Sequence, residues 1–313
     1  MKILFMGTPD FALFSLKKLV ESGEEVVAVI TQSDKPTGRG YILTPPPVKR
    51  WAVENGLPVY QPKTLKDEAF QTLLAQMDPD LIVVVAFGKL LPPSVIQYPK
   101  YGCINVHGSL LPEYRGAAPI QRAILDGKAL TGITTMYMAE GLDTGDMLLK
   151  AEVPILPDDN FETMHDKLGI VGADLLMDTI RQLKAGTLVP QKQDDACSTY
   201  APKIAKSDCL IDFRQEAAVV HNQIRGLSPC PLAFTHTPDG KILKVLAAHI
   251  SNKPVSANAL PGQVIGTEEN GFTVACGHGS ALVLLTVLPE GKSRMTGSDF
   301  LRGRKLSTGD ILQ

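Results

Sequence analysis

Short apolar runs alternate with segments of helical periodicity through the first half of the chain. Residues 25–31 and 81–87 are continuous, largely β-branched runs, which are typical of strands buried on both faces of a sheet. Residues 11–22 instead carry apolar side chains at helical spacing and are followed by Gly23, a common helix stop. Because strands that alternate with helices indicate right-handed βαβ units, we predict an α/β fold whose first domain is Rossmann-like, with a doubly wound, mainly parallel sheet. The other elements predicted in this half are strands at 2–6 and 103–107 and helices at 65–77, 118–126 and 161–185.

The pattern changes near residue 188. Residues 189–206 are polar and have no period, which is typical of an interdomain linker. One amphipathic helix at 217–227 follows, and then five short strands at regular spacing, which favour a small OB-like β-barrel, a fold often used to bind oligonucleotides. These strands are predicted at 232–237, 241–250, 262–266, 272–276 and 281–288. We place the first domain at residues 1–188, the linker at 189–206 and the C-terminal domain at 207–313.

Composition and charge narrow the class of protein. The 313 residues are 44% hydrophobic and 20% charged, close to globular averages, which excludes disordered, collagenous and coiled-coil proteins. No apolar run approaches the ~20 residues of a membrane-spanning helix, and the apolar start of the chain is too short for a secretory signal, so we expect a soluble intracellular protein. The net charge of -2 argues against coating nucleic acid by bulk charge, although residues 206–313 carry 11 Lys and Arg against 9 Asp and Glu.

Several common sites are missing from the sequence. The first strand–helix turn, residues 6–11, holds a single glycine and no GxGxxG motif, and no GxxxxGK[ST] motif occurs, which argues against a nicotinamide dehydrogenase and a P-loop NTPase. The five cysteines are widely spaced, without a CxxC motif or a histidine at ligand spacing, so we expect reduced, buried thiols and neither disulfides nor a zinc site. A GxSxG nucleophile motif is also missing.

The strand at 103–107 is where the chemistry is expected. Asn105 and His107 are two positions apart, so their side chains share one face, at the carboxyl end where open α/β sheets bind ligands. An amide donor and an imidazole suit a reaction in which a carbonyl oxygen becomes an oxyanion while a proton moves. Asp143 lies in a tight turn between two glycines and could orient a histidine or receive a proton. Alternatively, the Asn–His pair satisfies loop backbone groups, and residues 140–147 form a plain acidic turn or a weak metal site.

Three motifs together resemble the methionyl-tRNA formyltransferases, a group within the folate-dependent formyltransferase family. They are residues 105–112 (Asn-Val-His-Gly-Ser-Leu-Leu-Pro), 115–119 and 141–146, and the resemblance covers essentially the whole chain. The Asn-x-His-x-Ser-Leu-Leu-Pro core is shared by all folate-dependent formyltransferases, so it indicates the chemistry, whereas the Gly-Arg-Gly loop at 38–40 and the C-terminal domain indicate the acceptor. The resemblance implies transfer of a formyl group from 10-formyltetrahydrofolate to the α-amino group of methionine on initiator tRNA, for translation initiation.

The resemblance also assigns roles to residues. It implies that Asn105, His107 and Asp143 carry the catalysis, with Asp143 holding His107. The residues it implies for folate binding are Ser109, Leu110, Leu111, Pro112, Phe87, Gly88 and Leu91. It places the 32–48 loop at the acceptor end of the tRNA, and the residues that we expect to bind the tRNA are Arg39, Lys49, Arg302 and Arg304. The expected partners are folate and initiator methionyl-tRNA, without a metal or a membrane, and we expect a monomer in the bacterial cytoplasm.

Residues 41–43 (Tyr-Ile-Leu) are more apolar than the basic residues that some relatives carry there, so we expect a weaker electrostatic contribution from this loop. Two further positions depart from the family pattern, and several alternatives stay open. Phe213 and Cys230 stand where the family often has Trp, at the start of the C-terminal domain, which affects the expected tRNA contacts but not the chemistry. A folate-dependent formyltransferase could instead act on a small amine, such as phosphoribosylglycinamide or an amino sugar nucleotide. A non-catalytic nucleic-acid-binding protein and a formyltetrahydrofolate hydrolase are more distant alternatives.

Overall fold

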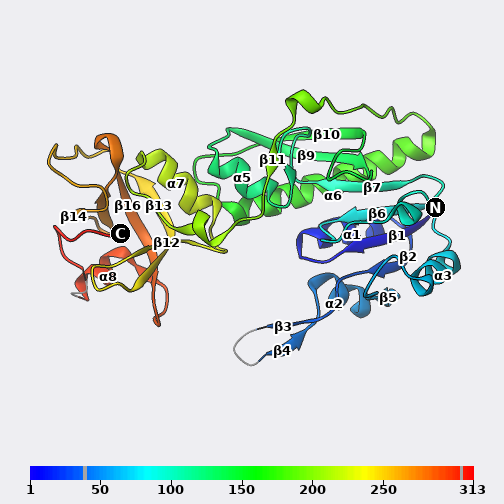
Figure 1. The fold of residues 1–313 in the computed structure, drawn as a ribbon, viewed down its shortest axis with the longest axis horizontal. Coiled ribbons are helices and arrows are strands. Elements are labelled where there is room, and N and C mark those ends of the chain that lie inside the picture. The colour runs from blue at the N-terminus through cyan, green and yellow to red at the C-terminus, as the bar shows by residue number, and fades with distance from the viewer. Residues whose placement is uncertain (38–40, 304–305) are drawn as a thin grey trace. The chain divides into compact units, whose positions relative to one another are not determined.

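The computed structural model describes residues 1–37, 41–303 and 306–313. The chain divides into two compact units (Figure 1). The first consists of residues 1–116, 130–154 and 165–201, and the second of residues 117–129, 155–164 and 202–313. Two short segments that precede residue 188, residues 117–129 and 155–164, therefore belong to the second unit. The domain boundaries at residues 188 and 206 are positions along the sequence and stay a prediction.

A seven-stranded sheet forms the centre of the first unit, in the order β10-β9-β7-β6-β1-β2-β5 (Figure 1). The five strands from β7 to β5 run parallel, and β9 and β10 are antiparallel at one edge. The strands are β1 (Lys2–Gly7), β2 (Glu25–Ile30), β5 (Val59–Tyr60), β6 (Leu81–Val85), β7 (Cys103–His107), β9 (Leu130–Tyr137) and β10 (Met147–Pro154). The apolar runs on which the sequence prediction rested are buried, because the central strands are covered on both faces.

Two helices of this unit begin at an aspartate that caps them. Asp10 accepts a hydrogen bond from the first N–H of α1, and Asp67 accepts one from Phe70 N in the first turn of α3. The helix predicted at 65–77 therefore begins three residues later than expected. The helices are α1 (Phe11–Glu21), α2 (Pro47–Glu54), α3 (Glu68–Met77) and α4 (Pro93–Ile96), and α6 (Phe161–Ala185) continues into this unit from its first turn.

Two small strand pairs extend the first unit. The antiparallel hairpin of β3 (Lys35–Thr37) and β4 (Ile42–Thr44) lies within the long connection between β2 and α2, and Figure 1 shows its strands extending away from the sheet. A parallel pair joins β8 (Arg115–Gly116) to β11 (Tyr200–Ala201). This second pair brings residues just before Ala201 back to the carboxyl ends of the central strands, which matters for the site below.

The second unit is built around an antiparallel sheet in the order β12-β13-β16-β15-β14, with β17 beside β16. Its core contains α7 and apolar residues from alternate strand positions, and Phe213 is buried in it. The elements are α5 (Pro119–Leu125), α7 (Ala217–Gly226), β12 (Ala233–His236), β13 (Ile242–Ile250), β14 (Val264–Thr267), β15 (Phe272–Ala275), β16 (Ala281–Pro289), β17 (Met295–Thr296) and α8 (Gly297–Arg302), with 3-10 turns at Asp195–Cys197 in the first unit and at Lys206–Cys209 and Gly277–Gly279 in the second. The predicted fold class, a Rossmann-like α/β domain followed by a small antiparallel β domain, is confirmed.

Candidate active site at the carboxyl ends of the parallel strands

Asn105 and His107 lie on one face of β7, as their spacing predicts. The strand is central, with Val84 of β6 on one side of Asn105 and Met136 of β9 on the other. The two side chains are almost fully buried, at 9% and 6% exposed. Within the described part of the chain the Asn105 amide donates no hydrogen bond to another protein group, so its two N–H donors remain for a ligand.

Each ring nitrogen of His107 faces an oxygen atom, and one of the two contacts is a hydrogen bond. Its Nε2 lies 2.9 Å from the carbonyl oxygen of Tyr114, and because a carbonyl can only accept, Nε2 carries a proton. Its Nδ1 lies 3.7 Å from Asp143 Oδ2, slightly beyond direct hydrogen-bond distance. A proton can pass between these two groups after a small closure or through one water molecule, so the pair is suited to general acid–base chemistry.

Asp143 is held in an unusual backbone conformation. Its φ of +52° lies in the left-handed region, which Asp tolerates better than most residues, and its Oδ2 accepts a hydrogen bond of 2.8 Å from Gly116 N. The neighbouring Gly145 is required by space, because a Cβ there would lie 1.8 Å from the Tyr137 carbonyl oxygen. The turn between β9 and β10 is therefore shaped to direct one carboxylate at His107.

Gln193 is a residue of this site that the sequence analysis did not find. It lies in the segment predicted as a linker, yet it is only 6% exposed and belongs to the first unit. Its Nε2 donates to the carbonyl oxygens of Asp143 (2.8 Å) and Gly145 (2.7 Å), and its Oε1 accepts from Arg115 Nε (2.9 Å). One polar residue in an aperiodic stretch gives no sequence signal, because only the fold brings it to the turn.

The residues expected to bind folate divide into two groups. Phe87, Leu91, Ser109 and Leu111 are buried, and the Ser109 hydroxyl donates to Glu113 O (2.6 Å). These four side chains are part of the protein interior under the loops. The remaining three, Gly88, Leu110 and Pro112, are partly or fully exposed and are the ones that can touch a ligand directly.

The loop after β6 is tied to the first strand–helix turn and to the end of β2. Phe87 O accepts hydrogen bonds from Thr8 Oγ1 (3.1 Å) and Gln32 Nε2 (2.8 Å). Gly88 follows with φ +75°, and a Cβ on it would meet the Gln32 amide nitrogen at 2.5 Å. A glycine at this position therefore leaves room for the Gln32 amide, and its own backbone is exposed.

Lys49, expected to bind tRNA, is already engaged within the protein. Its Nζ donates to both carboxylate oxygens of Asp34 (2.9 and 2.8 Å) and to Gln61 Oε1 (2.8 Å). The hydrogen bonds from Lys49 and Gln61 lower the pKa of the Asp34 carboxyl below its ordinary value of 3.8. Asp34 directly precedes β3 and Lys49 lies in the first turn of α2, so this ion pair closes the base of the β3–β4 hairpin.

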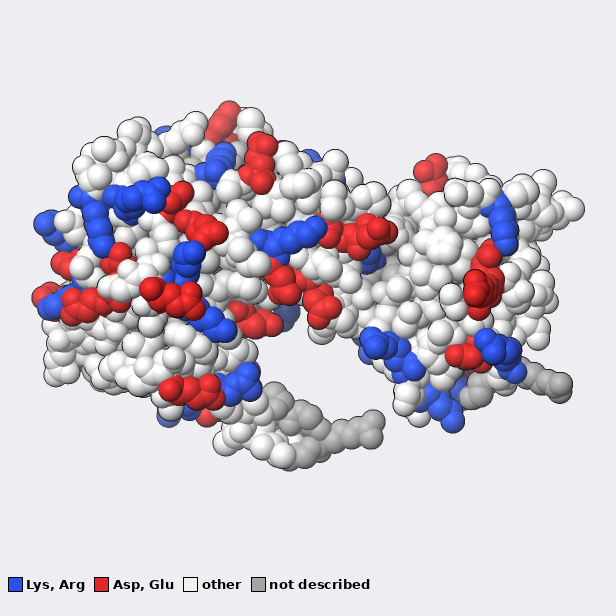
Figure 2. Space-filling view, turned by 180° about the vertical axis from the view of Figure 1, so that it is seen from behind, with Lys and Arg blue, Asp and Glu red and all other residues white. Residues whose placement is uncertain are grey.

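The other residues expected to bind tRNA are less defined. Arg39 and Arg304 lie outside the described residues. Arg302, at the end of α8, is largely exposed and lies 3.3 Å from Asp299. On the face shown in Figure 2, basic and acidic side chains are interspersed rather than gathered into a field of one sign. The described residues of this face therefore form no large basic patch.

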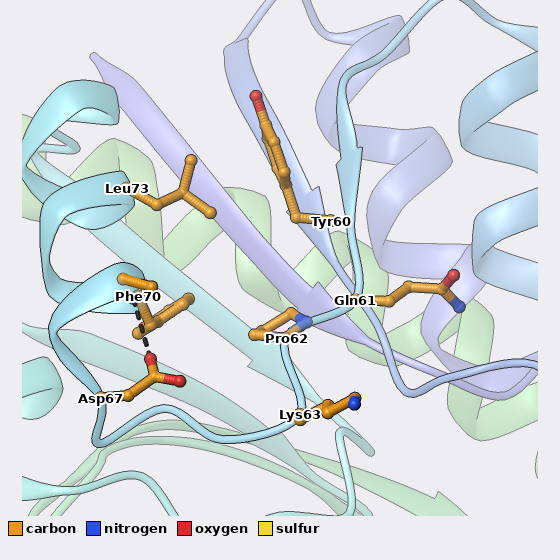
Figure 3. Close-up of a pocket in the computed structure, with 8 residues that line it drawn as sticks. Tyr60, Gln61, Pro62, Lys63, Asp67, Phe70 and Leu73 are labelled. Carbon is orange, nitrogen blue, oxygen red and sulfur yellow. Dashed lines mark hydrogen bonds between the residues drawn. The ribbon is translucent and has the colours of Figure 1, made fainter.

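One cavity in the first unit lies apart from these groups. It has a volume of about 350 Å³ and is lined by Tyr60, Gln61, Pro62, Lys63, Asp67, Ala69, Phe70 and Leu73. In Figure 3, Gln61 points away from the apolar side chains that face the cavity. None of the residues expected to bind folate lines it, so the candidate chemistry is placed by the hydrogen-bonded cluster and not by this cavity.

The cysteines and possible metal ligands add no second reactive centre. All five cysteines are unpaired, but the expectation that they are buried is wrong for Cys197 and Cys230, which are exposed. Burial raises the pKa of the Cys103 and Cys276 thiols to about 12. The described residues contain no group of three or more His, Cys, Asp and Glu side chains that could hold a metal ion. No described helix is long and apolar enough to cross a membrane.

The mainly parallel sheet presents the Asn–His pair opposite the aspartate turn, and comparison with known families identifies the class of protein. Residues 1–180 match the family described as "Formyl transferase", and residues 203–305 match "Formyl transferase, C-terminal domain". The chain belongs to the formyl transferase family.

Within that family the chain is similar to two bacterial proteins over its full length. It is 49% identical to the methionyl-tRNA formyltransferase of Bacillus subtilis (strain 168) over 312 residues, which cover 99% of this chain and 97% of that protein. It is 50% identical to the methionyl-tRNA formyltransferase of Halalkalibacterium halodurans over 314 residues, covering 100% of this chain and 98% of that protein.

Solved structures share the fold at low sequence identity. HypX from Aquifex aeolicus, solved in complex with tetrahydrofolic acid, superposes with a TM-score of 0.67 at 17% identity over 98% of this chain, which spans about half (48%) of the HypX chain. WlaRD, a sugar 3N-formyl transferase solved with dTDP and 5-N-formyl-THF, gives a TM-score of 0.67 at 19% identity and covers 94% of this chain and 99% of its own. These likenesses concern the fold.

Proposed function

We propose that this chain transfers a formyl group from 10-formyltetrahydrofolate to the α-amino group of methionyl initiator tRNA, and that it thereby serves translation initiation. The observation that supports this most is the buried cluster of Asn105, His107 and Asp143 in a chain that is about half identical, from end to end, to methionyl-tRNA formyltransferases.

The residues present suit a folate at this place. Asn105 has amide donors that no described protein group uses, and Gly88 has an exposed backbone in the loop that follows the neighbouring strand β6. Buried Phe87 and Leu91 give that loop an apolar floor, as expected of a site for a flat ring whose edges are read by backbone groups. When bound, 10-formyltetrahydrofolate supplies the formyl carbon, and the residues of this chain act on the groups around it.

The roles follow from the geometry of the donors. As the methionyl nitrogen bonds to the formyl carbon, negative charge develops on the formyl oxygen, and the Asn105 amide donates to that oxygen. His107 and Asp143 take the proton that the amine loses, and the nitrogen that leaves the formyl carbon gains a proton, so the reaction is balanced. Tyr114 O and Gly116 N hold the two acid–base groups on either side.

The acceptor is recognised, in this proposal, outside the buried cluster. Ile42 and Leu43 on β4 are 71% and 66% exposed, and Tyr41 precedes them with an exposed ring. Exposed apolar side chains on a projecting hairpin are suited to contact nucleotide bases, whose faces stack without sequence preference. The second unit, with Arg302, would add phosphate contacts, and the undescribed Arg39 and Arg304 would join them.

The direct test is formylation of charged initiator tRNA in the presence of 10-formyltetrahydrofolate. We expect faster formylation of initiator than of elongator methionyl-tRNA. Formylation of an amino sugar nucleotide or of phosphoribosylglycinamide, without formylation of methionyl-tRNA, would replace the proposed acceptor, and formate release without tRNA would indicate a hydrolase. The bacterial relatives support a bacterial enzyme. Its cytoplasmic location and its monomeric state stay predictions, the second of which light scattering would test.

A further inference from the structure

We propose that Gln193 is a positioning residue, which sets the place of Asp143 relative to His107. The inference rests on the proposed function, because it assigns a role in that reaction to a residue outside the cluster of reacting groups. Gln193 is separated from Asp143 by 50 residues, and it contacts the backbone of the turn rather than any group that reacts.

All the hydrogen-bonding groups of the Gln193 amide are used. Its nitrogen donates to two carbonyl oxygens, of Asp143 and Gly145, on either side of Thr144. Its oxygen accepts from Arg115 Nε. Because carbonyls only accept and a guanidinium only donates, the orientation of this amide is determined, and a carboxylate of the same shape could not replace the two donors. The side chain is buried, so water does not substitute for the lost bonds.

Three consecutive residues connect this amide to the reacting pair. Tyr114 O binds His107 Nε2, the Arg115 side chain binds Gln193 and Gly116 N binds Asp143 Oδ2. The backbone of this segment is itself held, since Arg115 N donates to Thr199 O at 2.9 Å. Residues 114–116 therefore hold His107 directly and hold Asp143 both by its carboxylate and, through Gln193, by its backbone.

These contacts from residues 114–116 and Gln193 are needed because the backbone of Asp143 is in a sparsely populated conformation. Asp143 has a positive φ, and its carboxylate stands 3.7 Å from Nδ1, a separation at which a small displacement decides whether a proton can be exchanged. Misplacement of a reacting group by about 1 Å can reduce a rate ~100-fold. Removal of the Gln193 donors should therefore reduce the rate of formyl transfer without removing any group that binds a substrate.

The experiment compares Gln193→Leu and Gln193→Glu with Gln191→Glu, a matched control two residues away whose side chain is exposed and whose backbone pairs with Met147. Single-turnover formylation at saturating folate and charged tRNA should be ~10- to 100-fold slower in both Gln193 variants and unchanged in the control. The dissociation constants for tetrahydrofolate and for tRNA should stay within about twofold of the unmodified protein. A normal rate in either folded Gln193 variant would overturn the proposal.

A double-mutant cycle separates positioning from a general structural role. If Gln193 acts through Asp143, Gln193→Leu should slow an Asp143→Asn enzyme less than threefold, because the group it positions has already lost its function. Fully multiplicative effects, or loss of folate binding in parallel with the rate, would contradict it. If Gln193→Leu does not fold, Gln193→Glu keeps the shape and the Arg115 partner and gives the same cycle. Absence of formylation by the unmodified protein would instead reject the proposed function.

Discussion

The turn that holds Asp143 and the β3–β4 hairpin both belong to the first unit, but they differ in the described contacts that hold them and in the exposure of their side chains. The turn is enclosed, and its backbone and carboxylate are fixed by Gln193 and Gly116. Among its described residues, the hairpin is held at its base by the Lys49–Asp34 ion pair and presents exposed apolar side chains such as Leu43. If Asp143 reacts and the hairpin binds tRNA, as proposed, internal hydrogen bonds place the reacting group while exposed side chains remain available to the large substrate.

The largest effect should follow from a change inside the enclosed region. Asn105→Ala removes the proposed donor to the oxyanion, a loss worth about 10²–10³ in rate at comparable sites. Single-turnover formylation at saturating substrates measures it, and tRNA affinity should not change. An unaltered rate in a folded variant would remove Asn105 from the catalytic set.

Asp143→Asn should produce the next effect, of about 10² in rate. The Asn side chain keeps an oxygen for Gly116 N but loses the charge and the ability to take a proton. The control is Asp146→Asn in the same turn, whose side chain is exposed. If the two variants were equally active, the turn would serve as structure only.

Leu43→Ser tests the open region. The change is neutral in charge and should weaken tRNA binding about fivefold to tenfold, because apolar surface of Leu43 is no longer buried against the tRNA, while the rate at saturating tRNA stays normal. Val189→Ser, another exposed apolar position of the first unit, is the control. A fall in the saturated rate with unaltered tRNA affinity would make the hairpin part of the chemistry and break the comparison.

Lys49→Met separates two roles for the same ammonium group. If Lys49 holds the base of the hairpin, the dependence of tRNA binding on salt should keep its slope and thermal stability should fall modestly. A direct phosphate contact, as the sequence suggested, would reduce that slope by about 1. Binding titrations across salt concentrations, with Lys17→Met as an exposed control on α1, distinguish these outcomes.

The smallest effect concerns a second histidine–aspartate pair, which lies outside the site. His165 Nε2 lies 3.4 Å from Asp10 Oδ1, and this contact raises the pKa of His165 above its ordinary 6.5 and lowers that of Asp10 below 3.8. The pair therefore stabilises the fold fully between these two ordinary values, and its contribution is lost as pH rises through the raised pKa of His165.

Asp10→Asn keeps the cap of α1 and removes this charge pairing. Because Asp10 is mostly exposed and screened by solvent, the loss should be at most about 1 kcal/mol, or a Tm about 2–4 °C lower at pH 6. At pH 9 the variant and the unmodified protein should melt alike. A difference that grows with pH would contradict the assignment, and formylation should be unaffected throughout.

The sequence predicted the three residues of the proposed reacting cluster better than the contacts that hold them in place. A spacing of two on a strand was sufficient to place Asn105 and His107 on one face, and two glycines marked the turn at Asp143. Gln193 could not be predicted, because its role depends on a contact across 50 residues and a lone polar residue has no periodicity. For the same reason the sequence did not indicate that the Lys49 ammonium group donates hydrogen bonds to Asp34 and Gln61. Nor does periodicity reveal that residues 117–129 join the second unit.

In this proposal the enclosed Asp143 turn determines the rate of the reaction, and the exposed β3–β4 hairpin determines the affinity for tRNA. Single-turnover formylation, measured as a function of charged tRNA concentration, separates these two quantities. For Asp143→Asn we expect the rate at saturating tRNA to fall about 100-fold, while the tRNA concentration that gives half of the maximal rate stays unaltered. For Leu43→Ser we expect a normal saturated rate and a half-saturating concentration raised about fivefold to tenfold. Curves in which both variants lose rate and affinity together would contradict this proposal.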